Sequence, residues 1–178
     1  MLPVGVFAFL GGIALGSRSK KPLSMLPPKK PIVWERFVTI MAVSPRSHVS
    51  PRRRLGAFQM DARQLGDIGW VEAPRKMVVG KELGVWSGKW KDGLSEEKFL
   101  ASAPLQYEAF KKSVKRISPK VQKYVGTLVD GHKCSLSGLL GVAHHAGVIG
   151  VDSWVKDPDV RKRFKTTTET FKKTNGIF

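Results

Sequence analysis

The chain has 178 residues and a formal net charge of +17, from 31 lysines and arginines against 14 aspartates and glutamates. Its length leaves room for one compact domain and a short extension, and a hydrophobic share of 42% excludes a wholly disordered chain. The single cysteine, Cys134, excludes an intramolecular disulfide and with it a disulfide-stapled miniprotein. The charge predicts a polyanionic partner, such as nucleic acid, an anionic membrane or the acidic polymers of a bacterial envelope.

The first 31 residues differ in composition from the rest of the chain. Residues 2–15 are uncharged and apolar, a run shorter than the about 20 residues that span a bilayer. A basic, proline-rich stretch follows and predicts an extended linker. We expect residues 2–15 to pack into a larger assembly or to insert in a membrane; a signal sequence and an ordinary core helix are the alternatives. The predicted organisation is therefore 1–31, a hydrophobic segment with a basic linker, and 32–178, the folded domain.

Helical patterns dominate the domain and strict alternation is rare, so we predict a mainly α fold with little strand. Segment 32–43 is apolar nearly all round, as in a buried helix. Ser95 is followed by acids and is placed as the N-cap of a helix that runs to about residue 117, either unbroken or re-entered at Pro104. A further helix is expected to begin at Ser118-Pro119 and to end near residue 129. The glycine-rich segment 135–155 is expected to form one helix or a pair of helices, and a charged stretch begins at Asp157.

The connections carry proline, glycine and charge. Residues 46–54 form a polar loop, and regular structure is expected to resume over 55–64. Residues 80–94 contain four glycines together with Trp86 and Trp90, which is typical of an irregular connection.

Two passages resemble a single protein family. Val49-Ser50-Pro51 followed by Leu55-Gly56-Ala57-Phe58-Gln59-Met60 is similar to the "SP-x-G-x-x-G-L-M-Q" passage of lytic transglycosylases and goose-type lysozymes. Ala143-His144-His145-Ala146-Gly147, then Gly150, Val151 and Trp154, resembles their "A-Y-N-A-G-x-G-x-V-x-x-W" passage. The ending 174–178 resembles that of lysozyme-like proteins encoded by tailed bacteriophages. The resemblance implies a lysozyme-like fold, with segment 32–43 as the first helix of the active site and Gln59 and His144 on opposite walls of one cleft.

Glycosidic cleavage needs a carboxylic acid that protonates the leaving oxygen. The resemblance to lytic transglycosylases implies one Glu at the end of the first helix, at a set distance before the glycine of the G-x-x-Q passage. Counting back from Gly56 gives Met41, and a gapped match gives Ser44; neither is an acid. The candidates for a substitute are Asp61 and Glu35, although Glu35 lies about 240° round the helix from Met41. An acid from another chain is a third route, and whether the domain is an enzyme is left open, with a preference for a domain that does not cut.

The resemblance also implies substrate contacts. Gln59 matches a glutamine that lines the saccharide cleft, and His144 and His145 stand where the family has Tyr and Asn. The alternative is that one histidine faces the core and the other faces solvent. His132 and Cys134 with the two histidines lack the spacing of a zinc site, and adjacent helical residues point about 100° apart. We therefore predict neither a metal nor a cofactor.

Three basic runs support a second interpretation. Arginines 52–54, the lysines and arginine of 111–116 and the run 161–165 could bind phosphates, and Trp86 and Trp90 could stack on bases or on sugars. The simplest interpretation of such runs is a solvated surface. The alternative function is a non-catalytic, cationic structural or assembly protein of a virion or of a particle that contains nucleic acid.

The sequence as a whole predicts a component of a bacteriophage tail, baseplate or injection apparatus. Its lysozyme-like domain would engage or locally degrade host peptidoglycan. The expected partners are peptidoglycan and other virion structural proteins, with a membrane reached through residues 2–15 and nucleic acid in the alternative. The expected location is the virion tail, acting at the bacterial cell envelope.

Overall fold

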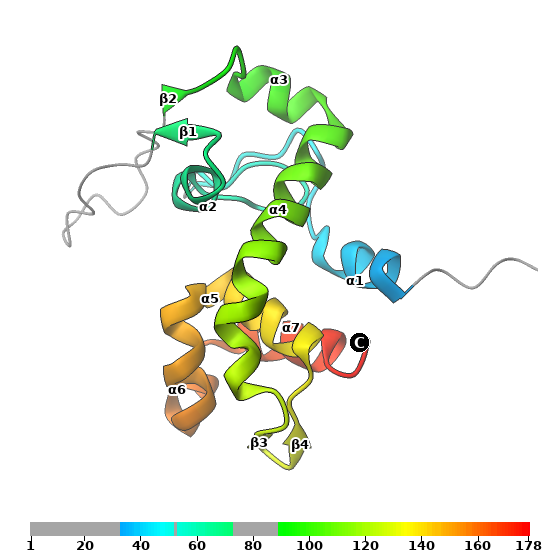
Figure 1. The fold of residues 1–178 in the computed structure, drawn as a ribbon, viewed down its shortest axis with the longest axis vertical. Coiled ribbons are helices and arrows are strands. Elements are labelled where there is room, and N and C mark those ends of the chain that lie inside the picture. The colour runs from blue at the N-terminus through cyan, green and yellow to red at the C-terminus, as the bar shows by residue number, and fades with distance from the viewer. Residues whose placement is uncertain (1–32, 52, 73–88) are drawn as a thin grey trace, which may run out of the picture. The chain divides into compact units, whose positions relative to one another are not determined.

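The computed structural model describes residues 33–51, 53–72 and 89–178. The hydrophobic segment 2–15, its linker and Trp86 lie outside these residues. The described part is mainly helical, which confirms the predicted class, and none of its helices has the length and apolar character needed to cross a bilayer. Its elements in chain order are α1 (Val33–Met41), α2 (Ala62–Asp67), β1 (Val71–Glu72), β2 (Lys89–Trp90), α3 (Glu96–Ala101), α4 (Ala103–Val121), the 3-10 helix η2 (Gln122–Tyr124), β3 (Leu128–Val129), β4 (His132–Lys133), α5 (Leu136–Lys156), α6 (Pro158–Arg163) and α7 (Lys165–Thr174) (Figure 1).

Helix α5 is the centre of the packing and contacts α4, α6 and α7 (Figure 1). Its approach to α7 depends on the absence of a side chain at Gly141, where a Cβ atom would lie 2.7 Å from Thr174 Oγ1. Phe110 from α4 and Phe37 from α1 are fully buried, with ring centroids 6.0 Å apart. The largest fully buried side chains are those of Trp154, Phe37, Phe99, Phe110, Met41, Leu55, Met60, Leu65 and Leu139.

Several predicted boundaries are confirmed and others are wrong. Ser95 caps α3 by accepting a hydrogen bond from the Lys98 amide. Ser102 then caps a separate helix, α4, with Pro104 in its first turn, so the predicted segment 95–117 is two helices, as the re-entry at Pro104 implies. Pro119 lies inside α4 and starts no new helix. A proline in the last turn costs one intrahelical hydrogen bond, which burial of Ile117 and Val121 on the same helix offsets.

A β-hairpin replaces the end of the helix predicted over 118–129. Strands β3 and β4 pair in antiparallel register, with Leu128 opposite Lys133. Between them Asp130 and Gly131 both have positive φ, at 47° and 78°. This is the backbone of a type I′ turn, and Asp-Gly is one of its preferred dipeptides.

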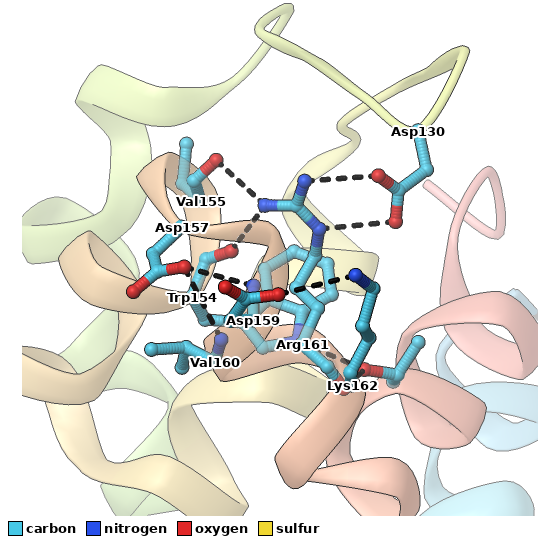
Figure 2. A network of polar contacts seen from close by, with 9 residues as sticks. Asp130, Trp154, Val155, Asp157, Asp159, Val160, Arg161 and Lys162 are labelled. Carbon is cyan, nitrogen blue, oxygen red and sulfur yellow. Dashed lines mark hydrogen bonds and ion pairs between the residues drawn. The ribbon is translucent and has the colours of Figure 1, made fainter.

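Arg161 is buried, so the run 161–165 is not a continuous surface of cations. Its Nε and Nη2 donate hydrogen bonds to the carboxylate of Asp130 at 3.0 and 2.9 Å. Its Nη1 donates to the carbonyls of Trp154 and Val155 at 2.8 and 3.0 Å (Figure 2). Both carbonyls lie in the last turn of α5, where they lack a partner within the helix. One guanidinium therefore caps α5 and fixes the hairpin against it.

The segment after α7 folds back on the start of α5. The side chain of Asn175 accepts a hydrogen bond from the Ser135 amide at 2.7 Å. The amide of Phe178 donates to Ser137 Oγ at 3.3 Å, and the ring of Phe178 lies 5.3 Å from that of Phe37. These contacts join α1, α5 and residues 174–178.

Candidate functional site

A tight turn over residues 55–60 carries the passage that resembles the G-x-x-Q motif. Leu55 and Met60 form an isolated antiparallel bridge and exchange two backbone hydrogen bonds, which closes the turn. Gly56 has φ of 72° and Gln59 has φ of 50°. The side chain of Gln59 turns back and donates from Nε2 to the Gly56 carbonyl at 2.8 Å. The predicted regular structure over 55–64 is this turn followed by α2.

Gln106 on α4 holds this turn in place through its side chain. The sequence did not identify Gln106 as a candidate residue. Only 1% of it is exposed, and its Oε1 accepts a hydrogen bond from the Ala57 amide at 2.9 Å. Its Nε2 donates to the Phe99 carbonyl at 2.9 Å and lies within bonding distance of two further carbonyls. A Cβ atom on Gly56 would lie 2.5 Å from Gln106 Oε1. The signal in the sequence that could have identified Gln106 is its position as a polar residue within the apolar face of a predicted helix.

His144 joins the same turn to α5. Its Nε2 lies 2.6 Å from the carbonyl oxygen of Phe58, which can only accept, so Nε2 carries the proton. Its Nδ1 then accepts from Gln64 Nε2 at 3.4 Å, and the same Nε2 also donates to the His144 carbonyl at 3.0 Å. Both ring nitrogens are thus engaged by protein atoms. In this arrangement His144 supports the turn that carries Gln59 and does not present a nitrogen to a sugar.

The environment of His144 favours the neutral ring. Burial, together with the nearby charges of His145 and Arg54, lowers the pKa of His144 to about 4, although the hydrogen bond to Phe58 opposes this shift. Because the unfolded chain binds this proton more readily, the stabilisation is complete above about pH 6.5 and is lost as the pH falls toward 4. The loss amounts to about 3 kcal/mol at most.

A pH series of denaturant midpoints tests this assignment. His144→Gln should be less stable than the wild type at pH 7 and should lose less stability between pH 6.5 and 4, because the titrating ring is gone. His132→Gln, at an exposed histidine, is the matched control and should keep the wild-type slope. Parallel slopes for the wild type and His144→Gln would contradict the assignment.

His145 faces α7. Its Nε2 lies 3.2 Å from Thr170 Oγ1, which already donates its proton to the Thr166 carbonyl, so the imidazole is the donor in this pair. Burial and the charge of Arg54 lower the pKa of His145. Two residues later Gly147 adopts φ of 72° and ψ of 165°, which kinks α5. The prediction of one helix or a pair over 135–155 is confirmed as two helical pieces joined at this glycine.

The end of α1 lies against the other side of the turn. The Ser44 amide donates to the Ala57 carbonyl at 3.2 Å. Met41, at the position that the gapless match gives to the acid, is 1% exposed and belongs to the hydrophobic core. Ser44 is half-buried. Three segments that the resemblance brings together, the end of α1, the turn and α5, therefore meet in the structure.

The two candidate acids lie in different places. Asp61 is the N-cap of α2: its Oδ1 accepts from the Gln64 amide at 2.8 Å, and the Gln64 side chain accepts from the Asp61 amide. Gln64 also binds His144, so Asp61 is connected to the site through one side chain. Glu35 is exposed in the first turn of α1, away from the buried Phe37 and Met41. Of the two, Asp61 is the one that the fold brings near the turn.

The arrangement offers amide and hydroxyl groups for hydrogen bonding and a carboxylate that serves as a helix cap. Over the described ranges, no three side chains of His, Cys, Asp or Glu come together as metal ligands. Trp90 packs on Phe99 with ring centroids 5.5 Å apart, and Arg53 pairs with Glu96 at 2.7 Å.

No family model, curated protein or solved structure matches the chain.

Proposed function

We propose that residues 32–178 are a lysozyme-like domain that binds host peptidoglycan without cleaving it, as part of a bacteriophage tail or injection apparatus. One observation carries the proposal. The end of α1, the turn with Gln59 and the kinked α5 meet at one place, as the resemblance to lytic transglycosylases implies. Of the two positions that the resemblance gives to the acid, Met41 is buried and Ser44 carries no carboxyl group.

The loss of cleavage follows from the chemistry of those positions. A general acid contributes about 10²–10⁴-fold and must reach the leaving oxygen within hydrogen-bonding distance. A thioether has no proton to give, and the core covers Met41. Binding requires less than turnover: the polar groups near the turn and a cationic surface are sufficient to hold an anionic wall polymer.

A cationic assembly protein that binds nucleic acid is the second candidate. It is favoured by α4, where Lys111, Lys112, Lys115 and Arg116 are exposed on one helix. Arg116 is paired with Asp67 at 2.6 Å, and Lys112 lies over the ring of Trp70 at 5.3 Å, which leaves Lys111 and Lys115 as the strongest phosphate contacts of this group.

A pull-down with purified peptidoglycan distinguishes the two. The full chain should sediment with the polymer, more weakly as salt rises because exposed charges are screened. Gln59→Ala should weaken binding about tenfold, as the loss of a polar contact to a ligand does. Gln122→Ala, at an exposed glutamine after α4, is the matched control and should bind like the wild type. Binding that Gln59→Ala leaves intact and that duplex DNA displaces would favour the nucleic-acid function.

A further inference from the structure

Two aliphatic side chains are exposed to solvent at the start of the β3–β4 hairpin. Leu128 is 72% exposed and Val125, just before the hairpin, is 40% exposed. The neighbouring Val129 is 3% exposed and anchors the other face of the hairpin in the core. We call Val125 and Leu128 the tip; they lie at the base of the hairpin, at the end opposite its turn, and follow α4 and η2 in the chain. Figure 1 shows the β3–β4 hairpin beyond the C-terminal end of α4.

The hairpin is held firmly in this position. Backbone hydrogen bonds join the Cys134 amide to the Thr127 carbonyl at 2.9 Å and the Gly126 amide to the Cys134 carbonyl at 2.8 Å. Asp130, at the turn, accepts two hydrogen bonds from Arg161 (Figure 2). The tip residues are therefore exposed on a preorganised platform and not on a loose loop.

Exposed lysines precede the tip in the chain and face it across the hairpin, and the nearby acids Asp130 and Asp152 are paired with cations. Lys120, Lys123 and Lys133 are all exposed, and Lys133 lies directly opposite Leu128 in the hairpin. From residue 109 to 151 the chain has seven lysines and arginines and one acid, Asp130, which is paired with Arg161. The next acid, Asp152, is paired with Lys156 at 2.9 Å and accepts a hydrogen bond from Tyr124.

We propose that this tip and its lysines dock on an anionic lipid surface, with Leu128 and Val125 in the acyl boundary and Lys120, Lys123 and Lys133 at the headgroups. Charge complementarity selects an anionic partner, and the aliphatic tip selects a bilayer over a nucleic acid. Single-stranded nucleic acids are bound mainly through aromatic stacking and phosphate contacts, to which an exposed leucine adds little. Aliphatic residues surrounded by lysines are the pattern of interfacial membrane binding. This inference is independent of the proposed function.

Vesicle sedimentation tests the docking with the full chain. Vesicles of equimolar phosphatidylglycerol and phosphatidylcholine should bind the protein, and phosphatidylcholine alone should bind it much less. Lys123→Gln with Lys133→Gln should weaken binding by roughly fivefold per lysine, and Leu128→Ser by about tenfold. The controls are Lys172→Gln with Lys173→Gln, on exposed lysines of α7, and Ile149→Ser, at an aliphatic residue that is 88% exposed on α5. Both should bind like the wild type.

A site-specific label separates the tip from any binding through residues 2–15. Cys134 is buried and burial raises the pKa of its thiol, so a maleimide bimane reacts with an introduced cysteine. Bimane on Leu128→Cys should shift to the blue on anionic vesicles, while bimane on Ile149→Cys should not. Sedimentation without a shift at Leu128, or an absence of binding to the anionic vesicles, would overturn the proposal.

Discussion

Gly56→Ala should destabilise the domain by about 4 kcal/mol. A side chain at φ of 72° costs about 1 kcal/mol of backbone strain. The new Cβ atom would also lie 2.5 Å from Gln106 Oε1, so the buried glutamine must move. Its displacement breaks the bond to the Ala57 amide and leaves buried carbonyls without their donor, at about 1–3 kcal/mol for each unsatisfied group. Urea denaturation followed by circular dichroism measures the loss.

Gly69→Ala isolates the backbone strain. Gly69 has φ of 82°, and a Cβ atom there would meet no atom within 4 Å. The substitution should cost only about 1 kcal/mol. Equal losses for the two variants would show that Gln106 does not hold the turn, and that the account of how the turn is positioned is wrong.

Met41→Glu should fail to restore an active site and should destabilise the domain by about 4 kcal/mol at pH 7. The side chain at this position is buried in the core, so the carboxylate loses its hydration, and the pKa of the new glutamate rises. Because the folded pKa lies above the unfolded value, the penalty is smallest near pH 4, where it approaches that of the uncharged Met41→Gln, and grows as the pH rises toward 7.

Two variants control for the new charge and the new shape. Val43→Glu places the same carboxylate two residues later, at a side chain that is 58% exposed, and should cost less than about 0.5 kcal/mol. Met41→Gln should destabilise the domain without the pH dependence. A Met41→Glu protein that is as stable as the wild type and that releases muropeptides would show that the position is open to substrate.

Local signals predicted much of the fold. Ser95 acts as the N-cap because its hydroxyl satisfies a free amide, which is a property of neighbouring residues. Gly147 likewise kinks α5 through a local property, because glycine readily adopts the positive φ found there. The prediction at Pro119 was wrong because a proline near the end of a helix removes one hydrogen bond and crowds one carbonyl, and tertiary burial of the helix offsets that cost. The Asp130-Gly131 dipeptide is a hairpin signal that the prediction of a helix to residue 129 did not use, and strands of two residues are too short to show alternation.

The site depends on contacts between distant segments, which no local pattern specifies. His144 meets the Phe58 carbonyl across 86 positions of the chain, and Gln106 meets the Ala57 amide across 49. The sequence indicated that residues near 56–59 and 144 belong together through the resemblance alone. It gave no indication that both nitrogens of His144 are engaged, nor that Asp61 is the cap of α2 and bonds to the same glutamine as His144.

Binding and turnover measured in one reaction test the central claim most directly. The full chain is incubated with purified peptidoglycan, the polymer is sedimented, the bound protein is quantified, and soluble muropeptides are separated by chromatography. We expect protein in the pellet and no muropeptide above the buffer control, because neither Met41 nor Ser44, the two positions that the resemblance gives to the acid, is a carboxylic acid. Robust release of muropeptides by the unmodified protein would contradict the claim. Asp61→Asn, which keeps a good helix cap, and Glu35→Gln would then identify the acid by loss of that release.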